Sequence, residues 1–597
     1  MPSFLEKPHH QLSIVQNYYS DSLFGLSKNR HRKSLRVMKE QRVDETEDQI
    51  SKLPDPISHH FMGLLLAKDA AQISTLSKTL YAAWSSLPYL NFGDRFFYRE
   101  VHGRWILSEK IQELVHIVDQ TLANRKKHKI SVQKFWLKVP SSYRMSSSYV
   151  RNWIKILVTS NIKELILKVG ESDSSFDSLP EELFVVEGLN VLNLRGFKLG
   201  LPPDHGIKFS SLRKLRLTDT YLDEQLIQAL CASCVCLEKL RLSCCRGLAS
   251  LRIAASLQKL KTVWLRCLPE LQIVDIAAPN VENLYIESQL WNLQVVKITC
   301  CKSLQTLYIV DVDVTDGWLE DLLVNQPNLE CLSLSGCLKL QKIKISSDRL
   351  KYLALSWCLE LINVVLETPT LTRFRYKCDE NLPTLKLMKS SVFLVLKLEF
   401  SLTNILDSHW YSMLMKFLGN FKQSKAIKLD CCDRDGIVIP KDTRENMVPP
   451  LYVANATWYI KFNTFGDCSL VDILDSLLWI SPQLDTLILV QESNLNTTLK
   501  FIDEDASAEG EKFLWRHKLK KVRMANFTCM EQQELRNYLF TNEDYIGEEA
   551  FSKLMEWDCD YCRRKELHLL VDNDEEAIAD VKKLLMVSLI FGAFKEV

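Results

Sequence analysis

The sequence predicts an α/β protein: a small helical domain, then a long solenoid of short repeats, then a mixed α/β cap. Residues 329–345 and 350–366 each open with leucines at positions i, i+3 and i+5, continue with a cysteine at i+8, and end on a second apolar triplet. The chain also has 597 residues, too many for one compact core. Together these features are typical of leucine-rich repeats, whose leucines are buried only when neighbouring repeats stack.

The overall charge of the chain points to no particular class of partner. Apolar residues make up 47% of the chain, charged residues 25%, and the formal net charge is +1. A charge so close to zero favours neither nucleic acid nor an anionic membrane as a partner. The N-terminus lacks the apolar run of a secretory signal, and the apolar run 584–594 is about half of the ~20 residues that span a bilayer. We therefore expect an intracellular protein, in the nucleus, the cytoplasm or both, without a membrane partner.

The eighteen cysteines would suit a small secreted domain with disulfides, but the length and the lack of a signal argue against one. Cys245, Cys301, Cys337 and Cys358 each follow an apolar strand residue by three positions, which predicts one recurring place in the repeat. We expect these thiols to act as small buried hydrophobic groups in a reducing compartment.

Residues 1–47 are predicted to be a disordered tail, because they show no apolar periodicity. They hold a basic cluster, 28–36, followed by an acidic run, 44–48. A solvated tail accounts for both runs. A nuclear-targeting or nucleic-acid patch is the alternative interpretation of the basic cluster.

Residues 48–97 are predicted to form the small helical domain. Apolar residues at 57, 61, 64 and 65, and again at 73, 76, 80 and 84, have the spacing of two or three short amphipathic helices. Asp69 is expected to cap a helix that runs through Leu76, and Pro54 and Pro88 bracket the segment. So small a domain leaves apolar surface for a partner or the next domain to cover.

Residues 98–420 are predicted to form the solenoid, with strand-like triplets at intervals of roughly 20–25 residues in its central part. The triplets begin at Val132, Ile162, Leu189, Leu212, Leu237, Leu260, Val281, Leu304, Leu329, Leu350, Leu371 and Phe393. The return segments between them, such as 340–345 and 361–366, are short and rich in β-branched residues. Between about 237 and 376 we therefore predict strands on both faces of the solenoid. Helices are expected mainly at the longer return segments, Asp223–Ala232 and Asp316–Asn325.

Residues 421–597 are predicted to hold degenerate repeats and a closing region. Strand-like triplets recur at 484–489 and 519–524, separated by an acidic stretch, 503–510, that is expected to be a surface loop. Residues 531–540 and 575–586 have the pattern of helices that would cap the solenoid.

The helical segment resembles an F-box, in the form found in plant F-box/leucine-rich-repeat proteins. The matching pieces are Ile50–Asp55, Lys68–Ala70, Leu76–Lys78, Trp84–Pro88 and Asn91–Phe96. A weaker resemblance links residues 519–527 and Glu534–Leu535 to the FBD-type C-terminal region of the same family. The order of box, leucine repeats and C-terminal region makes the resemblance specific.

The resemblance implies that the box docks on a Skp-type adaptor, which joins it to a cullin–RING ubiquitin ligase, while the repeats select the protein to be ubiquitinated. By position, the docking face and its support would be Leu53, Pro54, Ile57, Phe61, Leu64, Leu65, Lys68, Leu76, Ser77 and Trp84. Pro56, Leu66 and Thr79 depart from the family's usual residues. We therefore expect adaptor binding that is weaker than the family average.

Side chains alternate across a sheet, so the residues flanking the strand leucines should line the concave face of the solenoid. The candidate substrate-binding residues on that face are Arg195, Arg216, Arg241, Trp264, Arg266, Tyr285, Tyr308, Arg373 and Arg375. Arginine and aromatic anchors are typical of interaction surfaces, and arginine suits carboxylate or phosphate. Our hypothesis is that this strip holds an acidic or phosphorylated segment of a partner protein. A solvated sheet face whose long side chains cover leucines is the alternative.

No cofactor or catalytic site is expected. Cys559 and Cys562 have zinc-like spacing, with His568 and Cys529 as conceivable further ligands, but a closed zinc site usually needs two such pairs. The sequence has no phosphate-cradling loop or nucleophile elbow. We predict a non-catalytic substrate-recognition subunit of a ubiquitin ligase; the alternative is a non-degradative scaffold or receptor with a vestigial box.

Overall fold

The computed structural model falls into two compact units, residues 1–237 and 238–597, which we call the first and the second unit. The structure describes residues 54–65, 67–93, 98–101, 104–107, 111–139, 147–169, 177–202, 206–289, 291–378, 382–390, 394–400, 408–421, 424, 426–431, 438–445, 456–462, 470–482, 484–491 and 521–525. The predicted tail, the acidic loop, the closing helices, Leu53 and the four candidate zinc ligands all lie outside these residues.

The first unit opens with three short helices, α3 (Asp55–Leu64), α4 (Ala67–Ser74) and α5 (Lys78–Ser86), as the apolar spacing predicts. The hydroxyl of Ser77 caps α5 by accepting a hydrogen bond from the backbone N–H of Leu80 at 3.1 Å. The predicted cap at Asp69 is wrong, because α4 begins at Ala67 and ends before Leu76. Alanine and lysine are good helix formers, so the helix starts before Asp69.

The rest of the first unit is a parallel sheet in the order β1-β4-β5-β7-β9, with helices between its strands. The sheet strands are β1 (Tyr89–Phe92), β4 (Lys134–Lys138), β5 (Glu164–Lys168), β7 (Val191–Arg195) and β9 (Lys214–Thr218). The remaining elements are the hairpin β2 (Tyr98–Val101) and β3 (Arg104–Leu107), the short strands β6 (Asp177–Ser178), β8 (Phe197–Leu199) and β10 (Tyr221–Leu222), and the helices α7 (Ile111–Lys127), α8 (Ser147–Thr159), η1 (Glu181–Val185) and α9 (Glu224–Ser233).

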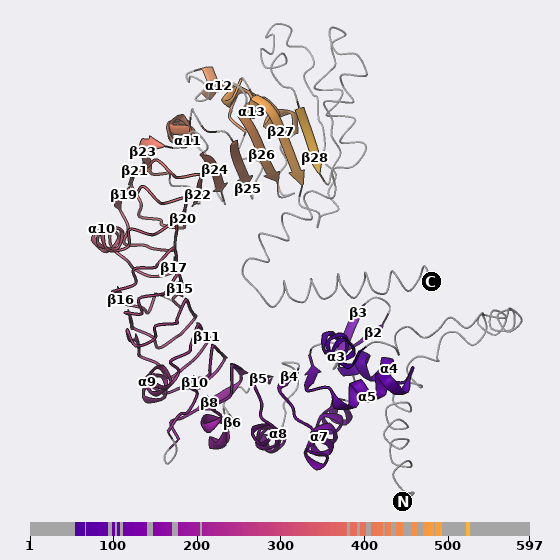
Figure 1. Cartoon of the computed structure of the whole chain (residues 1–597). Helices are drawn as coiled ribbons and strands as arrows, with labels where there is room; N and C mark the ends of the chain where they lie inside the picture. Colours follow the sequence, from indigo (N-terminus) through magenta and orange to yellow (C-terminus); the bar gives the residue numbers. More distant parts are fainter. Residues whose placement is uncertain are drawn as a thin grey trace, which may run out of the picture. The chain divides into compact units, whose positions relative to one another are not determined.

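The second unit is built on a long parallel sheet (Figure 1), which we call the long sheet. Its strands are β11 (Lys239–Ser243), β13 (Thr262–Arg266), β15 (Asn283–Glu287), β17 (Thr306–Val310), β18 (Cys331–Ser335), β20 (Tyr352–Ser356), β22 (Arg373–Cys378), β24 (Val395–Phe400), β25 (Ala426–Cys431), β26 (Ala456–Phe462), β27 (Leu484–Gln491) and β28 (Lys521–Ala525). From β4 to β24, the strands that carry the predicted triplets each begin two residues after the triplet's first apolar residue. The leucine-rich-repeat fold is therefore confirmed.

Between β11 and β24, the return segments of the second unit are extended, as predicted, except at Asp316–Asn325. They form two parallel sheets of their own, β12 (Ser250–Ile253), β14 (Ile273–Ile276) and β16 (Val295–Ile298), and β19 (Lys342–Ser346), β21 (Asn363–Thr368) and β23 (Thr384–Ser390). Figure 1 shows β19, β21 and β23 on one side of the unit and β20, β22 and β24 on the other. The predicted helices are also present, as α9 and as α10 (Asp316–Asn325), each capped by a side chain, Asp223 and Thr315 respectively.

The core of the second unit lies between these sheets and consists of the repeat leucines with the apolar residues of the return strands. Cys245, Cys337 and Cys358 are buried there, and each Sγ lies 3.4 to 3.6 Å from the carbonyl oxygen two residues earlier. Cys301 is buried too, but it follows the return strand β16 rather than a strand of the long sheet. The prediction that all four cysteines occupy the same position in the repeat is therefore wrong for Cys301. Both turns of the repeat contain a position that lies three residues after an apolar strand residue, so the spacing alone does not distinguish them.

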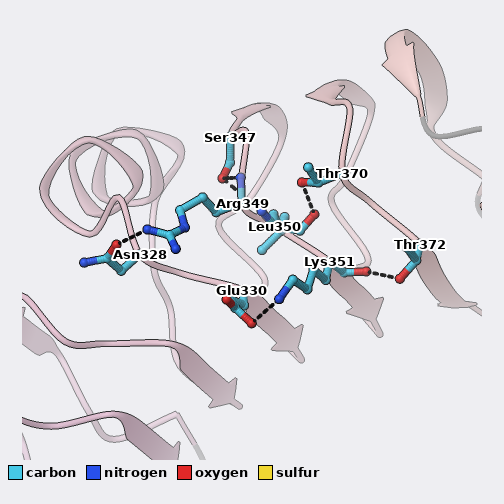
Figure 2. Close-up of polar contacts among 8 residues, drawn as sticks. All are labelled: Asn328, Glu330, Ser347, Arg349, Leu350, Lys351, Thr370 and Thr372. Carbon is cyan, nitrogen blue, oxygen red and sulfur yellow. Dashed lines mark hydrogen bonds and ion pairs between the residues drawn. The ribbon is translucent and has the colours of Figure 1, made fainter.

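Polar side chains join consecutive repeats just before the strands begin (Figure 2). Lys351 Nζ donates to Glu330 Oε2 at 2.7 Å, and the Thr372 hydroxyl donates to the Lys351 carbonyl at 3.1 Å. Arg349 Nη1 donates to Asn328 Oδ1 at 2.7 Å. These charged residues therefore serve the stacking of repeats.

Among the described residues after β24, four helical segments alternate with the strands of the long sheet. They are α11 (Ser408–Leu418), η2 (Gly419–Phe421), α12 (Lys441–Glu445) and α13 (Leu470–Ile480). No helix among the described residues has the length and apolar character needed to cross a membrane.

Candidate partner-binding surfaces

The helices α3 to α5 carry the residues that the resemblance assigns to adaptor docking. Pro54 is exposed at the start of α3, and Ile57 on the next turn is 52% exposed. Phe61 is half-buried and Leu65 is buried, so Leu65 supports the surface rather than forming it. Leu64 and Lys68 lie in α3 and α4, but their side chains are outside the described set.

The turn between α4 and α5 presents a second apolar residue. Leu76 is 72% exposed, immediately before the capping residue Ser77. Trp84 in α5 is half-buried. Exposed aliphatic side chains on a small helical unit are the kind of surface that a protein partner covers.

A buried arginine, which sequence analysis missed, fastens the end of α5. Arg125 in α7 is 5% exposed, and its guanidinium donates hydrogen bonds to the carbonyl oxygens of Leu87 and Trp84. Burial lowers the pKa of Arg125 to about 10, so it remains a cation at neutral pH. Arg125 opens a basic run with Lys126 and Lys127, and such a run usually indicates a solvated helix end.

Four of the predicted concave residues lie side by side on the exposed face of the long sheet. Register pairs Arg241, Trp264, Tyr285 and Tyr308 across β11, β13, β15 and β17. The rings of Trp264 and Tyr285 stack with centroids 3.8 Å apart and an interplanar angle of 7°. Arg241 caps the stack, with its guanidinium carbon 4.5 Å from the Trp264 centroid. We call Trp264, Tyr285 and Tyr308 the aromatic row.

A carboxylate on the same face pairs with the neighbouring arginine. Arg266 Nε lies 3.2 Å from Glu287 Oε2, and the hydroxyl of Tyr285 donates a hydrogen bond to Glu287. Burial alone would raise the pKa of Glu287, but the hydrogen bonds from Tyr285 and Cys267 and the charge of Arg266 lower it overall. The positive charge of Arg266 is thus balanced within the sheet.

The remaining arginines of the predicted strip are divided between the two units. In the first unit, Arg216 is half-buried on β9, and Arg195 on β7 forms an ion pair with Asp219 at 2.7 Å. In the second unit, Arg373 and Arg375 lie on β22. The small residues expected between the aromatic row and β22 are Ser333 and Ala354, at register positions on β18 and β20.

Arg375 belongs to a cluster that sequence analysis did not find. Arg375 Nε and Lys397 Nζ each lie 2.7 Å from Glu399 Oε1, and Lys377 Nζ lies 3.5 Å from Glu399 Oε2. The directed hydrogen bond runs from Arg375 Nη2 to Glu399 Oε2 at 2.9 Å. We call these four residues the Glu399 cluster. Charges at alternate positions of two successive strands, 373–377 and 397–399, were the signal that could have revealed it.

The Glu399 side chain is only 8% exposed. Its burial would raise the pKa, but the hydrogen bonds and charges of Arg375 and Lys397 lower the pKa of Glu399 to about 2. The carboxylate is therefore ionised at neutral pH. Among the residues that the structure describes, no group of three or more His, Cys, Asp or Glu could hold a metal ion.

The fold defines a leucine-rich-repeat protein that presents a row of aromatic and cationic side chains. Residues 124–296 and 293–533 match the family model described as At1g61320/AtMIF1, LRR domain. The chain belongs to this family.

Curated relatives come from Arabidopsis thaliana. The putative F-box/LRR-repeat protein At5g41840 is 28% identical over 208 residues, covering 34% of this chain and 38% of that protein. The putative F-box/FBD/LRR-repeat protein At4g03220 is 27% identical over 248 residues, covering 40% of this chain and 47% of that protein. The chain thus spans less than half the length of either relative. The FBD-associated F-box protein At1g61320 is 32% identical over 134 residues, covering 22% of this chain and 29% of that protein.

Proposed function

We propose that this protein is a substrate-recognition subunit of a Skp–cullin–F-box type ubiquitin ligase. The helices α3 to α5 dock on the Skp-type adaptor, and the exposed face of the long sheet holds the protein to be ubiquitinated. The observation that carries the proposal is the pair of exposed aliphatic residues, Ile57 and Leu76, on three helices that precede the repeats. The F-box names of the Arabidopsis relatives support it.

The energetics favour docking through these two side chains. Covering one fully exposed aliphatic side chain contributes about 1.5–3 kcal/mol. Ile57 and Leu76 are 52% and 72% exposed, so covering both contributes roughly 2–4 kcal/mol, compared with about 8 kcal/mol for a micromolar interface. Beside Ile57, Pro54 is exposed and Phe61 is half-buried, whereas Leu65 is buried and the Ser77 hydroxyl caps α5. Trp84 is half-buried in α5.

Co-purification of the full chain with a Skp-type adaptor tests the proposal. The variants Ile57→Asp and Leu76→Asp place a carboxylate where the apolar contact would form, and neither removes a buried residue. We expect each to weaken adaptor binding at least tenfold, or by more than about 1.4 kcal/mol.

Val235→Asp is the matched control, because Val235 is also 52% exposed but lies in the turn after α9. It should leave adaptor binding unchanged. If the wild-type chain does not bind the adaptor, or if all three variants bind like wild type, the ligase role fails and a non-degradative scaffold becomes the better interpretation.

A further inference from the structure

The exposed face of the long sheet changes in charge along the chain. The strands β18 and β20 present uncharged residues there, among them Ser333 and Ala354. Among the side chains that the structure describes, the next three strands, β22, β24 and β25, carry five basic residues and one acidic residue, an excess of four positive charges. The basic residues are Arg373, Arg375, Lys377, Lys397 and Lys428. Positive charge is thus concentrated on one stretch of the sheet.

The Glu399 cluster lies in this stretch. Its three cations surround one carboxylate, which leaves the four residues with two excess positive charges. Arg195 and Arg266 differ, because each pairs one to one with a carboxylate: Arg195 with Asp219, which directly follows β9, and Arg266 with Glu287 on the next strand. The carboxylate also holds Arg375 and Lys397 at fixed positions, since both contact the same oxygen at 2.7 Å.

The excess charge matches a phosphate group better than a carboxylate. A phosphorylated side chain carries about −1.5 to −2 charges at pH 7 and three strong acceptor oxygens, whereas a carboxylate carries one charge. Arginine provides a planar donor fork for such oxygens, and lysine adds a mobile point charge. The partly exposed Arg375 and Lys397 supply one of each.

We propose that Arg375, Lys377 and Lys397 bind the phosphate of a phosphorylated side chain in the partner segment that the long sheet holds. This inference rests on the proposed function, whose substrate class it narrows. The residues of the partner next to the phosphorylated one then run over the small side chains of Ser333 and Ala354 to the aromatic row. Tyr308 and Arg375 are three strand spacings apart, about 14 Å, which about four extended residues span.

Fluorescence polarisation with the full chain and a labelled peptide tests the inference. The probe is Gly-Trp-Gly-Ser-Gly-pSer-Gly-Ser-Gly, in which the tryptophan precedes the phosphoserine by four residues. The comparison peptides carry serine or glutamate in place of phosphoserine. We expect the phosphopeptide to bind at least tenfold more tightly than the serine peptide, with the glutamate peptide between them. Added salt should reduce this difference.

Arg375→Met and Lys397→Met should each weaken phosphopeptide binding about tenfold and leave the serine peptide unaffected. Lys344→Met is the matched control, because Lys344 on β19 also pairs with a glutamate, Glu367, at 3.1 Å but lies on a return strand. It should change binding less than twofold. Thermal unfolding of each variant verifies that the fold is intact.

The inference is overturned if the phosphorylated and serine peptides bind alike or not at all, or if Lys344→Met costs as much as Lys397→Met. Adaptor co-purification of the same proteins separates this outcome from a failure of the proposed function. Phosphate discrimination without adaptor binding would leave the phosphate site in place and remove the ligase role. Adaptor binding without phosphate discrimination would leave the ligase role in place and remove the phosphate site.

Discussion

At the scale of single residues, the residue that follows several strands of the long sheet has a left-handed backbone conformation. Asp311, Gly336 and Trp357 have φ values of 54°, 63° and 55°. Each donates its backbone N–H to a carbonyl oxygen at the end of the next strand, at 2.8 to 2.9 Å; the acceptors are Ser335, Ser356 and Lys377. This conformation costs a residue other than glycine roughly 1–2 kcal/mol, and the hydrogen bond that extends the ladder offsets part of that cost.

Gly336→Ala should therefore destabilise the protein. A Cβ at this position would lie 2.0 Å from Asp311 Oδ1 in addition to adopting a positive φ. We expect a loss of about 1–2 kcal/mol in the free energy of unfolding, measured by denaturant titration. Gly317→Ala in α10 is the control, because its added Cβ meets nothing within 4 Å; it should be neutral or stabilising by about 0.5 kcal/mol. Equal losses in both variants would refute this account of Gly336.

Glu399 makes stability depend on acidity. Its pKa is depressed to about 2 in the folded protein, whereas an unfolded glutamate titrates near its ordinary value of about 4.3. The stabilisation is therefore fully present above the unfolded pKa and is lost as the pH falls toward 2. We expect the unfolding temperature of wild type to exceed that of Glu399→Gln by a constant margin from pH 7 to about 5, and by less below pH 4. Glu367→Gln, at a more exposed ion pair, should show little of this dependence; a margin that grows in acid would contradict the assignment.

At the scale of elements, the sequence pattern correctly predicted those helices and strands that depend on residues close together in the chain. The β-branched Ile343 and Val364 favour extended return strands, and Asp223 supplies a cap at the start of α9. These features depend on residues a few positions apart. Burial of Arg125 depends instead on contacts with residues about 40 positions away, which no sequence window contains.

The contacts within the Glu399 cluster likewise could not be predicted from the sequence. The aromatic row could be predicted, because equal spacing in successive repeats places residues side by side. That Arg375 and Lys397 share one carboxylate depends on side-chain conformation across two strands. Sequence analysis therefore predicted which residues lie side by side, but it did not find the carboxylate that Arg375 and Lys397 share.

The link between α5 and α7 is the element-scale contact that we expect to matter most. Arg125→Met removes the donors to the Leu87 and Trp84 carbonyls while keeping much of the side chain's volume. We expect the free energy of unfolding to fall by about 1–3 kcal/mol, with weaker adaptor binding as a consequence. Denaturant titration and adaptor co-purification measure the two effects. Lys126→Met, at an exposed position on the same helix, should change stability by less than about 0.5 kcal/mol.

At the scale of the whole molecule, the two proposed binding activities use residues of different units. Ile57 and Leu76 belong to residues 1–237, and the Glu399 cluster to residues 238–597. A recognition subunit needs both activities at once, because it must hold the ligase and the protein to be modified together. Each proposed activity is assigned to its own set of side chains, so a substitution in one set removes none of the contacts proposed for the other.

We therefore expect the two activities to be separable. Ile57→Asp should weaken adaptor binding at least tenfold and keep the affinity for the phosphopeptide. Lys397→Met should weaken phosphopeptide binding about tenfold and keep the affinity for the adaptor, and the double variant should show both losses. Titration calorimetry with the adaptor and the phosphopeptide, each measured alone and in the presence of the other, would test this. For each ligand, the change in binding free energy in the double variant should equal the sum of the changes in the two single variants to within about 0.5 kcal/mol. A loss of adaptor affinity in Lys397→Met would instead mean that phosphate binding and adaptor docking are coupled through the chain.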